Sequence, residues 1–246
     1  MCSLNWREFD DHIGLVFTRD EAIHRPKALP PQRFSKAGVE YLMPVDPVGQ
    51  GSWIAVNNAG FTVFLLNDYQ GVLKSNSSDL QSRGQLIRAV AQCNTIEAIK
   101  GVVEAWSLER SQPFVLGVLH QDKQRRGMVH YSGTEPQLEW QPLPQQLYSS
   151  GDPEVNDIIR ARTAYVDQQQ IGSLEDLVRL HQSHKPLVND DFIYSLCMHR
   201  EVAESQSITV VSMTKGEVEM RYFAGSPCQL EPANWITKQI SCSHRL

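Results

Sequence analysis

The sequence predicts an α+β fold built on antiparallel sheets, and three observations point to it. Strand-like runs separated by turn residues occur near both ends of the chain, as in residues 53–66 and 207–223. Residues 79–93 and 96–106 repeat apolar side chains at helical spacing instead. Strands and helices do not alternate along the chain as they do in a parallel, doubly wound sheet. The strands are therefore expected to pair with near neighbours in antiparallel sheets.

The first expected hairpin begins at a cysteine. Residues 2–6 have the pattern of a strand, the polar segment 10–14 that of a turn, and residues 15–18 that of a returning strand. A hairpin of this length brings Arg19 back beside Cys2. A guanidinium stays protonated near neutral pH, so Arg19 can hold a thiolate or a substrate carboxylate but cannot act as a base. Asp20 can orient Arg19 or the α-amine, although a surface ion pair at a strand end is the alternative.

The next segment, residues 22–50, carries five prolines and is expected to be a mostly irregular loop with a short strand near residues 41–43. A long loop after the first hairpin is a reasonable cover for a substrate. Residues 53–66 then form the clearest hairpin, and its second strand is apolar on both faces, as in a central strand. That strand ends at Asn67, whose amide can donate to a developing oxyanion. The alternative for Asn67 is a cap on the following turn.

The middle of the chain is expected to hold further helices and strands. Asn94 and Thr95 offer an N-cap for the helix over residues 96–106. Residues 114–119 and 128–131 then alternate as strands do. Asp152-Pro153 begins a helix that reaches Tyr165, with Arg160 and Arg162 expected on its solvent side.

The last clear hairpin covers residues 207–213 and 218–223. Side chains alternate along a strand, so Arg221 and Phe223 share one face while Met220 and Tyr222 share the other. An inward-facing Arg221 needs a carboxylate or carbonyl partner. The alternative is an edge-strand arginine that faces water.

Composition excludes several classes of protein. The 246 residues can bury a core and are expected to form a single domain over residues 1–246. A formal net charge of −5 argues against a general nucleic-acid partner. No apolar run approaches the ~18–20 residues of a membrane span, and the early polar residues do not match a signal peptide. A cytoplasmic location is therefore expected.

The cysteines indicate reduced thiols. They are odd in number, without any Cys-x-x-Cys motif, which argues against a disulfide framework or a zinc site. Cys197 and His199 are close in sequence, but no second pair stands at zinc spacing, so no metal and no cofactor are expected. The five cysteines are Cys2, Cys93, Cys197, Cys228 and Cys242.

Cys2 directly follows the initiator methionine. It is a small residue, so removal of Met1 would be expected to leave one residue with both a thiol and a free α-amine. The reference pKa values of these groups, about 8.5 and about 7.7–8.0, lie close together, so the amine can accept the thiol proton near neutral pH. N-terminal nucleophiles are activated in this way without a histidine. The alternative is that a cysteine stands second by chance.

The motifs resemble those of the NRDE-domain proteins, the transport and Golgi organisation family. That family begins Met-Cys and carries Asn-Arg-Asp-Glu near position 20, and here Thr18 replaces the Asn before Arg19-Asp20-Glu21. Residues 51–60, with Trp53 near their start, resemble the family's Gly-Gly-Thr-Trp-Leu-Gly-Val-Asn-x-x-Gly stretch, and Asn67 falls at a family Asn step.

The resemblance implies the four-layer αββα sandwich of two antiparallel sheets that N-terminal nucleophile hydrolases share. It also implies an amidase or acyltransferase acting on a C–N bond of a small acylated substrate, with Cys2, Arg19, Asp20, Asn67 and Arg221 at catalytic positions. Related bile-salt hydrolases place their Asp three residues after the Arg, whereas Asp20 here follows by one.

Trp53 and Ser149 are the substrate-binding residues that the resemblance implies. Ser149 stands where the related bile-salt hydrolases and penicillin V acylases have an Asn, and its hydroxyl is a shorter donor. The alternative function is a carrier of haem or of an acyl-CoA or lipid, to which family members have been linked. A carrier would tolerate the replacement of Cys2. The sequence does not indicate the oligomeric state.

Overall fold

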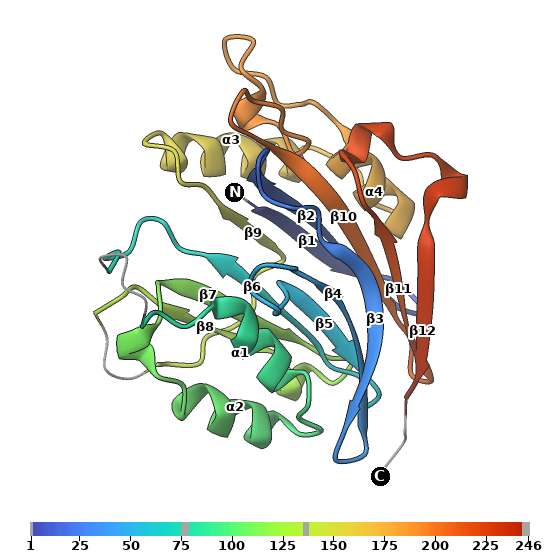
Figure 1. The fold of residues 1–246 in the computed structure, drawn as a ribbon. Coiled ribbons are helices and arrows are strands. Elements are labelled where there is room, and N and C mark those ends of the chain that lie inside the picture. Colours follow the sequence, from blue (N-terminus) through green and yellow to red (C-terminus); the bar gives the residue numbers. More distant parts are fainter. Residues whose placement is uncertain (1, 75–78, 135–137, 243–246) are drawn as a thin grey trace. The chain divides into compact units, whose positions relative to one another are not determined.

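The computed structural model of the chain describes residues 2–74, 79–134 and 138–242. These residues form two antiparallel sheets and four α-helices (Figure 1). The chain divides into two compact units, each assembled from segments that are far apart in sequence. Unit 1 consists of residues up to Lys27, Pro144–Ser212 and Met220–Thr237, and unit 2 of Ala28–Leu143, Met213–Glu219 and the residues from Lys238 onward. The expectation of a single domain over residues 1–246 stays a prediction.

The first sheet has most of its residues in unit 1. Its strand order is β12-β11-β10-β2-β1-β9, so both strands of the N-terminal hairpin β1–β2 are interior strands of the sheet. The central position buries both strands, and the residues from Ile13 to Asp20 in β2 are all buried. The six strands are β1 (Cys2–Glu8), β2 (Ile13–Ala22), β9 (Gln146–Ser149), β10 (Ala203–Met213), β11 (Glu217–Phe223) and β12 (Ile236–Ser241).

Two helices, α3 (Val155–Asp167) and α4 (Leu174–Gln182), pack against one face of this sheet (Figure 1). Ser173 caps α4, because its hydroxyl accepts a hydrogen bond from the Asp176 backbone N–H at 3.2 Å. Apolar side chains from the strands, such as Val16 and Ile208, meet Leu177 of α4 in a buried cluster. The face of the sheet that carries these side chains is called the helix-covered face below.

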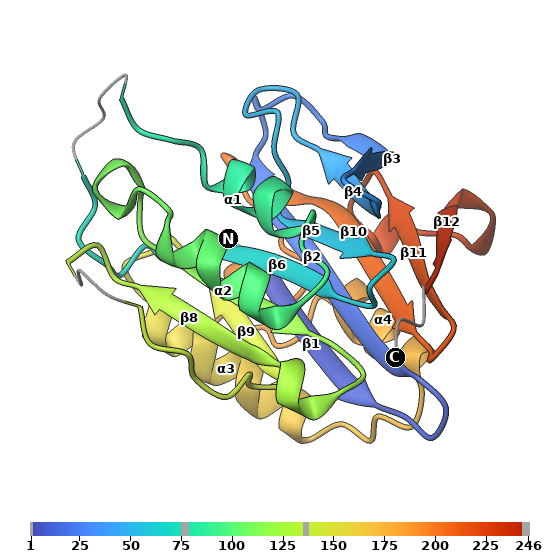
Figure 2. The same ribbon diagram turned by 90° about the horizontal axis from the view of Figure 1, so that it is seen from below.

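The second sheet, in unit 2, has the strand order β3-β4-β5-β6-β7-β8. Helices α1 (Arg83–Val90) and α2 (Ile96–Glu104) lie over it (Figure 2), and their apolar sides pack on the sheet in a second buried cluster. Thr95 caps α2 as the sequence predicts, accepting from the Ala98 backbone N–H at 3.1 Å. The strands are β3 (Leu29–Lys36), β4 (Val39–Val45), β5 (Ile54–Asn57), β6 (Thr62–Asn67), β7 (Phe114–Leu119) and β8 (Gly127–Tyr131).

The prediction of a mostly irregular loop over residues 22–50 is wrong. This segment forms the antiparallel pair β3–β4, in which Gln32 pairs with Met43 and Lys36 with Val39. β3 is an edge strand, where a proline needs no ladder hydrogen bond on its outer side, so Pro30 and Pro31 do not prevent strand formation. The segment is therefore part of the sheet scaffold rather than a long covering loop.

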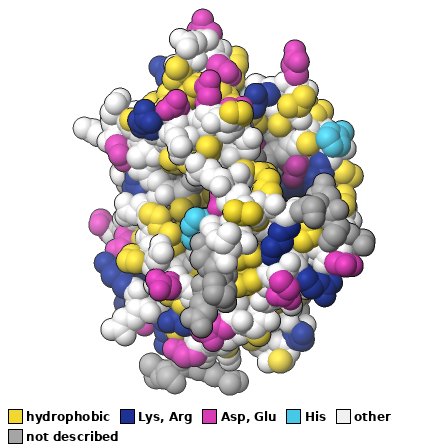
Figure 3. Space-filling view, turned by 90° about the vertical axis from the view of Figure 1, so that its left-hand side faces the viewer, with side chains coloured by type: hydrophobic (Ala, Val, Ile, Leu, Met, Phe, Trp, Pro, Cys, Tyr) yellow, Lys and Arg dark blue, Asp and Glu magenta, His cyan; other side chains and the backbone are white. Residues whose placement is uncertain are grey.

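On the side shown in Figure 3, acidic and basic side chains are interspersed with apolar ones. This mixture agrees with the small negative net charge of −5. Within the described part of the chain, no helix has both the length and the hydropathy required to cross a bilayer.

Candidate active site

Cys2 begins strand β1 and lies between two strands that carry residues predicted for the site. It pairs with Arg19 of β2 on one side and with Ser149 of β9 on the other. Side chains directly opposite each other in an antiparallel pair point to the same face, with Cβ atoms about 4.5–5.5 Å apart. Cys2, Arg19 and Ser149 thus stand in a row on one face of the first sheet, and the hairpin places Arg19 beside Cys2 as expected.

The protein environment disfavours ionisation of the Cys2 thiol. The side chain is partly exposed, yet the protein atoms around it raise its pKa by desolvation, and the negative charge of Asp20 adds to the rise. The positive charges of the chain terminus and of Arg19 act in the opposite direction. A thiol with a raised pKa needs a base close to the sulfur before it can attack a carbonyl. Met1 lies outside the described residues, so its removal stays a prediction.

Arg19 is fixed on the same face by two acceptors. Its Nη2 donates to Glu21 Oε2 at 2.9 Å, and its Nη1 donates to Gln206 Oε1 at 3.4 Å. Glu21 Oε2 also lies 3.5 Å from Nε of Arg25. Arg19 is the side-chain cation whose charge acts on the Cys2 thiol. Such a cation can hold a thiolate or an anionic group of a ligand.

Asp20 follows Arg19 in the strand, so its side chain points to the helix-covered face. Its Oδ1 accepts a hydrogen bond from Ser205 Oγ at 2.6 Å, and its Oδ2 has no hydrogen-bond partner among the described residues. Burial raises the pKa of the Asp20 carboxyl, while the charge of Arg162 and the Ser205 hydrogen bond act against the rise.

Arg162 is a site component that sequence reasoning missed. The prediction that it faces solvent is wrong, because its side chain is fully buried. Nη1 donates to Ser3 Oγ at 2.8 Å, Nη2 to the Ile193 carbonyl at 2.9 Å, and Nε to the Tyr194 carbonyl at 3.3 Å. The buried positions of α3 are 155, 158, 162 and 166, which is a helical stripe. This spacing could have predicted that position 162 is buried, but a charged residue is normally expected on the solvent side of a helix.

Ser149 belongs to the Cys2 row. It is 8% exposed, and its Oγ has no hydrogen-bond partner among the described residues. A buried hydroxyl without a partner is uncommon and needs an explanation. One explanation is that this hydroxyl donates to a bound ligand, which the sequence-based assignment of Ser149 to substrate binding requires.

The structure does not place Arg221 with Cys2. Arg221 Nη2 is 2.8 Å from Glu175 Oε1 of α4, and its guanidinium lies 5.2 Å from the centre of the Trp235 ring. Phe223, which shares its face, packs in the buried cluster with α4. Arg221 is therefore on the helix-covered face, whereas Cys2 points away from it. The catalytic assignment of Arg221 is corrected, because it finds its required carboxylate on a helix.

The strand face opposite Arg221 presents Tyr222, which is 1% exposed. Burial raises the pKa of the Tyr222 hydroxyl, and the positive charge of Arg19 opposes the rise. Tyr222, and not Arg221, thus lies on the face of the Cys2 row, where the charge of Arg19 acts on it. The alternation in the sequence placed the two residues on opposite faces but did not say which face is which.

A buried polar network holds strands β1 and β2 on the helix-covered face. His181 of α4 bonds through Nδ1 to Thr18 Oγ1 at 2.7 Å and through Nε2 to Asn5 Oδ1 at 2.9 Å. Asn5 Nδ2 in turn donates to the Tyr148 hydroxyl at 3.0 Å. Burial, helped by the Arg162 charge, lowers the pKa of His181 to about 3, so the ring is neutral at pH 7. The network fixes the register that aligns Cys2 with Arg19 and Ser149.

Two predicted site residues, Asn67 and Trp53, belong to unit 2. Asn67 ends β6, and its Nδ2 donates to the Tyr69 hydroxyl at 3.0 Å. Trp53 is buried just before β5, and its carbonyl accepts from the Leu65 backbone N–H at 2.8 Å. Their assignments to the oxyanion and to substrate binding stay predictions.

Several solved structures have folds similar to that of this chain. Penicillin V acylase from Agrobacterium tumefaciens aligns with a TM-score of 0.55 and 10% identity, covering 98% of this chain and 86% of that one. An N-acylethanolamine-hydrolyzing acid amidase orthologue from Caenorhabditis elegans aligns with a TM-score of 0.53 and 14% identity, covering 85% and 92%. The C2A mutant of a conjugated bile acid hydrolase from Clostridium perfringens gives 0.50 and 11%, covering 98% and 96%.

These likenesses confirm the predicted fold class, an α+β fold of the N-terminal nucleophile hydrolase type. The model of one protein family, Transport and Golgi organisation 2, matches residues 1–217. The chain belongs to that family, as its motifs predict. No functionally curated protein sequence matches the chain.

Proposed function

We propose that this protein is an N-terminal cysteine amidohydrolase that cleaves a linear C–N amide bond of a small acylated substrate. The observation that carries the proposal is the row of Cys2, Arg19 and Ser149 on one sheet face, at the very start of strand β1. The fold supports it, because the similar structures are named as acylases, amidases and hydrolases.

The proposed reaction begins after Met1 has been removed, when Cys2 carries both the thiol and a free α-amine. The amine takes the thiol proton, the sulfur attacks the amide carbonyl, and the C–N bond breaks as the ammonium returns the proton to the leaving amine. A thioester and a free amine result. Water then attacks the thioester, with the α-amine as base, and releases a carboxylic acid and the thiol.

Each neighbouring residue has a proposed part in these steps. Arg19, directly opposite Cys2 in the β1–β2 pair, holds the thiolate or a carboxylate of the substrate. Asp20 orients the α-amine of Cys2, since the Asp20 backbone and carboxylate both act on the Cys2 side chain. Ser149 donates its buried hydroxyl to the substrate. The oxyanion role of Asn67 and the substrate contact of Trp53 remain predictions from the sequence.

Because the pKa of the Cys2 thiol is raised, the reaction depends on the α-amine as the base that removes the thiol proton. A chain that retains Met1 holds the protonated sulfur in a desolvated place without an adjacent base. Loss of a general base typically lowers a rate by about 10²–10⁴-fold. Removal of the methionine therefore acts as the activating step in this proposal.

The test is hydrolysis of a panel of N-acyl amines and N-acyl amino acids, measured as release of the free amine. Three preparations separate the thiol from the amine: the chain that begins at Cys2, the Cys2→Ser variant of that chain, and a chain with one extra residue before Cys2. Cys242→Ser, in unit 2, is the matched thiol control. We expect activity only in the first preparation and in the control.

Two outcomes contradict the proposal. If the extended chain is as active as the chain that begins at Cys2, the α-amine is not the base. If Cys2→Ser retains full activity, the thiol is not the nucleophile. A carrier of a small molecule, the alternative predicted from the sequence, would turn over no amide and would bind its ligand equally well after Cys2→Ala.

A further inference from the structure

Four potential metal ligands converge in unit 1, outside the row that contains Cys2. His184 follows helix α4, Cys197 and His199 lie in the segment before β10, and Cys228 lies in the 3₁₀ turn Pro227–Gln229. One ligand atom from each of the four lies within 4.8 Å of every other. Three separate segments of the chain thus bring two thiols and two imidazoles to one place.

The separations fit a tetrahedral ion. With Zn–S bonds of about 2.3 Å and Zn–N bonds of about 2.0–2.1 Å, tetrahedral angles put sulfur and nitrogen about 3.5 Å apart. His199 Nε2 is 3.5 Å from Cys197 Sγ and 3.4 Å from Cys228 Sγ. These two distances therefore match two edges of the expected tetrahedron, and a small adjustment of His184 would complete it.

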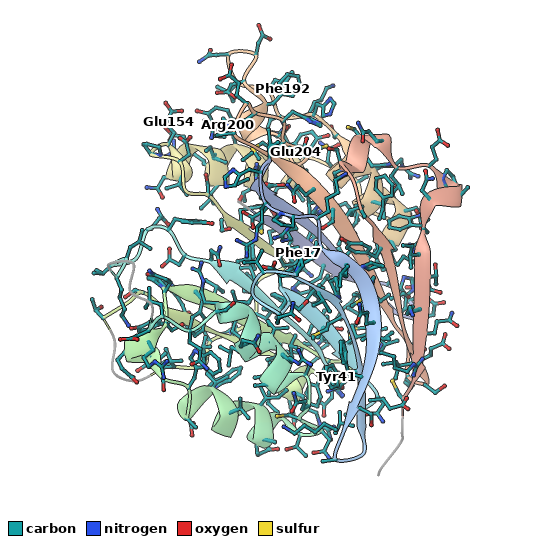
Figure 4. The ribbon with its side chains drawn as sticks, in the orientation of Figure 1. Phe17, Tyr41, Glu154, Phe192, Arg200 and Glu204 are labelled. Carbon is teal, nitrogen blue, oxygen red and sulfur yellow. The ribbon has the colours of Figure 1, made fainter. Side chains whose placement is uncertain are left out.

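His184 is ready to act as the fourth ligand. Its Nε2 is enclosed and has no hydrogen-bond partner among the described residues. Its ring meets the His199 ring edge to face at 5.1 Å, and Phe192, labelled in Figure 4, packs edge to face against it at 5.3 Å. The aromatic contacts set the position of the imidazole beside the two sulfurs.

We propose that His184, Cys197, His199 and Cys228 bind one zinc ion. Two thiolates and two neutral imidazoles form a Cys₂His₂ set, which selects Zn²⁺ among common divalent ions by its soft and borderline ligands. Binding exchanges two thiol protons, released to solvent, for the two positive charges of the ion. The occupied site is electrically neutral, so it can stay partly buried without a further counter-ion.

All four positions are filled by protein side chains, which is the arrangement of a structural zinc site. The ion would join the end of α4, the segment before β10 and the turn at Cys228. Met198, between two ligands, exchanges hydrogen bonds with Ser205, whose backbone N–H donates to the Met198 carbonyl and whose Oγ accepts from the Met198 N–H, both at 2.9 Å. Ser205 Oγ also donates to Asp20. Zinc would thereby stabilise the position of Ser205, the hydrogen-bond donor to Asp20.

The sequence predicted no metal because it offered only one close pair of ligands. Cys197 and His199 form that pair, whereas His184 precedes it and Cys228 follows it at spacings of no zinc motif. The fold supplies the missing pair by packing α4 and the 3₁₀ turn against the same segment.

The test is a Co²⁺ titration of the metal-free full chain under reducing conditions, with Zn²⁺ as competitor. We expect one Co²⁺ per chain, intense visible bands typical of tetrahedral cobalt, and thiolate-to-cobalt charge transfer in the near ultraviolet.

Cys228→Ser is the main variant, since Cys228 is exposed and the substitution leaves the core intact. It should weaken binding by at least about 100-fold, more than loss of an outer-shell partner does, and reduce the charge-transfer band. Cys242→Ser is the matched control and should bind as the unmodified chain does.

A second variant, His184→Asn, tests the imidazole that lies outside the Cys197-x-His199 pair and should weaken binding similarly. Three outcomes overturn the proposal. They are the absence of saturable Co²⁺ binding, an unchanged spectrum in both Cys228→Ser and His184→Asn, and a disulfide between Cys197 and Cys228 in protein isolated with thiol trapping. The last outcome would make the two thiols a redox pair.

Discussion

Replacing Arg162 by Met should destabilise the protein strongly, because Arg162 is a fully buried cation that donates to a hydroxyl and to two backbone carbonyls. The change removes hydrogen bonds to Ser3 and to the carbonyls of Ile193 and Tyr194, and it removes the positive charge that opposes the raised pKa of Asp20. Each buried acceptor left without its donor costs about 1–3 kcal/mol. This is a large part of the ~5–15 kcal/mol free energy of unfolding of a typical protein.

The measurement is urea unfolding of Arg162→Met at pH 7 and at pH 5. A buried carboxyl whose folded pKa lies above its unfolded value loses stability as pH rises. The penalty should therefore be larger at pH 7 than at pH 5. The matched control is Arg160→Ala on the same helix, where an exposed ion pair with Asp157 should contribute less than about 1 kcal/mol.

Two results would refute this reasoning. A loss below about 1 kcal/mol for Arg162→Met, equal to that of Arg160→Ala, would show that the buried cation is not an essential partner. A double-mutant cycle with Asp20→Asn gives the second check, since neighbouring charges should couple by about 0.5–3 kcal/mol. Strict additivity would mean that Arg162 and Asp20 do not interact.

Three further predictions follow from single contacts. Between pH 6.5 and about 3 the unfolded chain binds a proton at His181 that the folded chain does not, so the free energy of unfolding should fall by about 1.4 kcal/mol for each unit by which the pH is lowered. Urea unfolding of His181→Gln over the same range should lack this contribution to the pH dependence. Gly51→Ala would put a Cβ 2.2 Å from the Gly84 backbone and should cost about 1–3 kcal/mol, whereas Gly101→Ala in α2 meets nothing and should gain about 0.5–1 kcal/mol; equal thermal shifts would contradict this. Ser149→Ala should leave thermal stability nearly unchanged but slow acylation of Cys2 about tenfold, the equivalent of one hydrogen bond of about 1.4 kcal/mol, and an unchanged rate would remove Ser149 from the site.

The parts of the fold that local patterns determine were predictable. The hairpin β1–β2, the hairpin β5–β6 and the cap of α2 at Thr95 depend on neighbours in sequence, and the sequence analysis placed them correctly. The pair β3–β4 was missed because prolines usually interrupt a strand, and only its place at a sheet edge makes them tolerable.

The parts of the site that depend on long-range packing were not predictable. The hairpin brings Arg19 to Cys2, but only the pairing of β9 with β1 brings Ser149 there, across most of the chain. Arg162 was placed in solvent because a charge masked its position in a buried helical stripe. The face of Arg221 could not be predicted, because alternation gives only relative faces and its partner Glu175 comes from a helix far away in sequence.

The most direct test of the central proposal is to trap the acyl-enzyme. The full chain made in cells is mixed with an N-acyl amide, quenched in acid within the first turnover, digested and examined by mass spectrometry. The account predicts an N-terminal peptide that starts at Cys2 and carries the mass of the acyl group as a thioester. A peptide that retains Met1 and carries no acyl group, or an acyl group found only on Cys93, Cys197, Cys228 or Cys242, would contradict it.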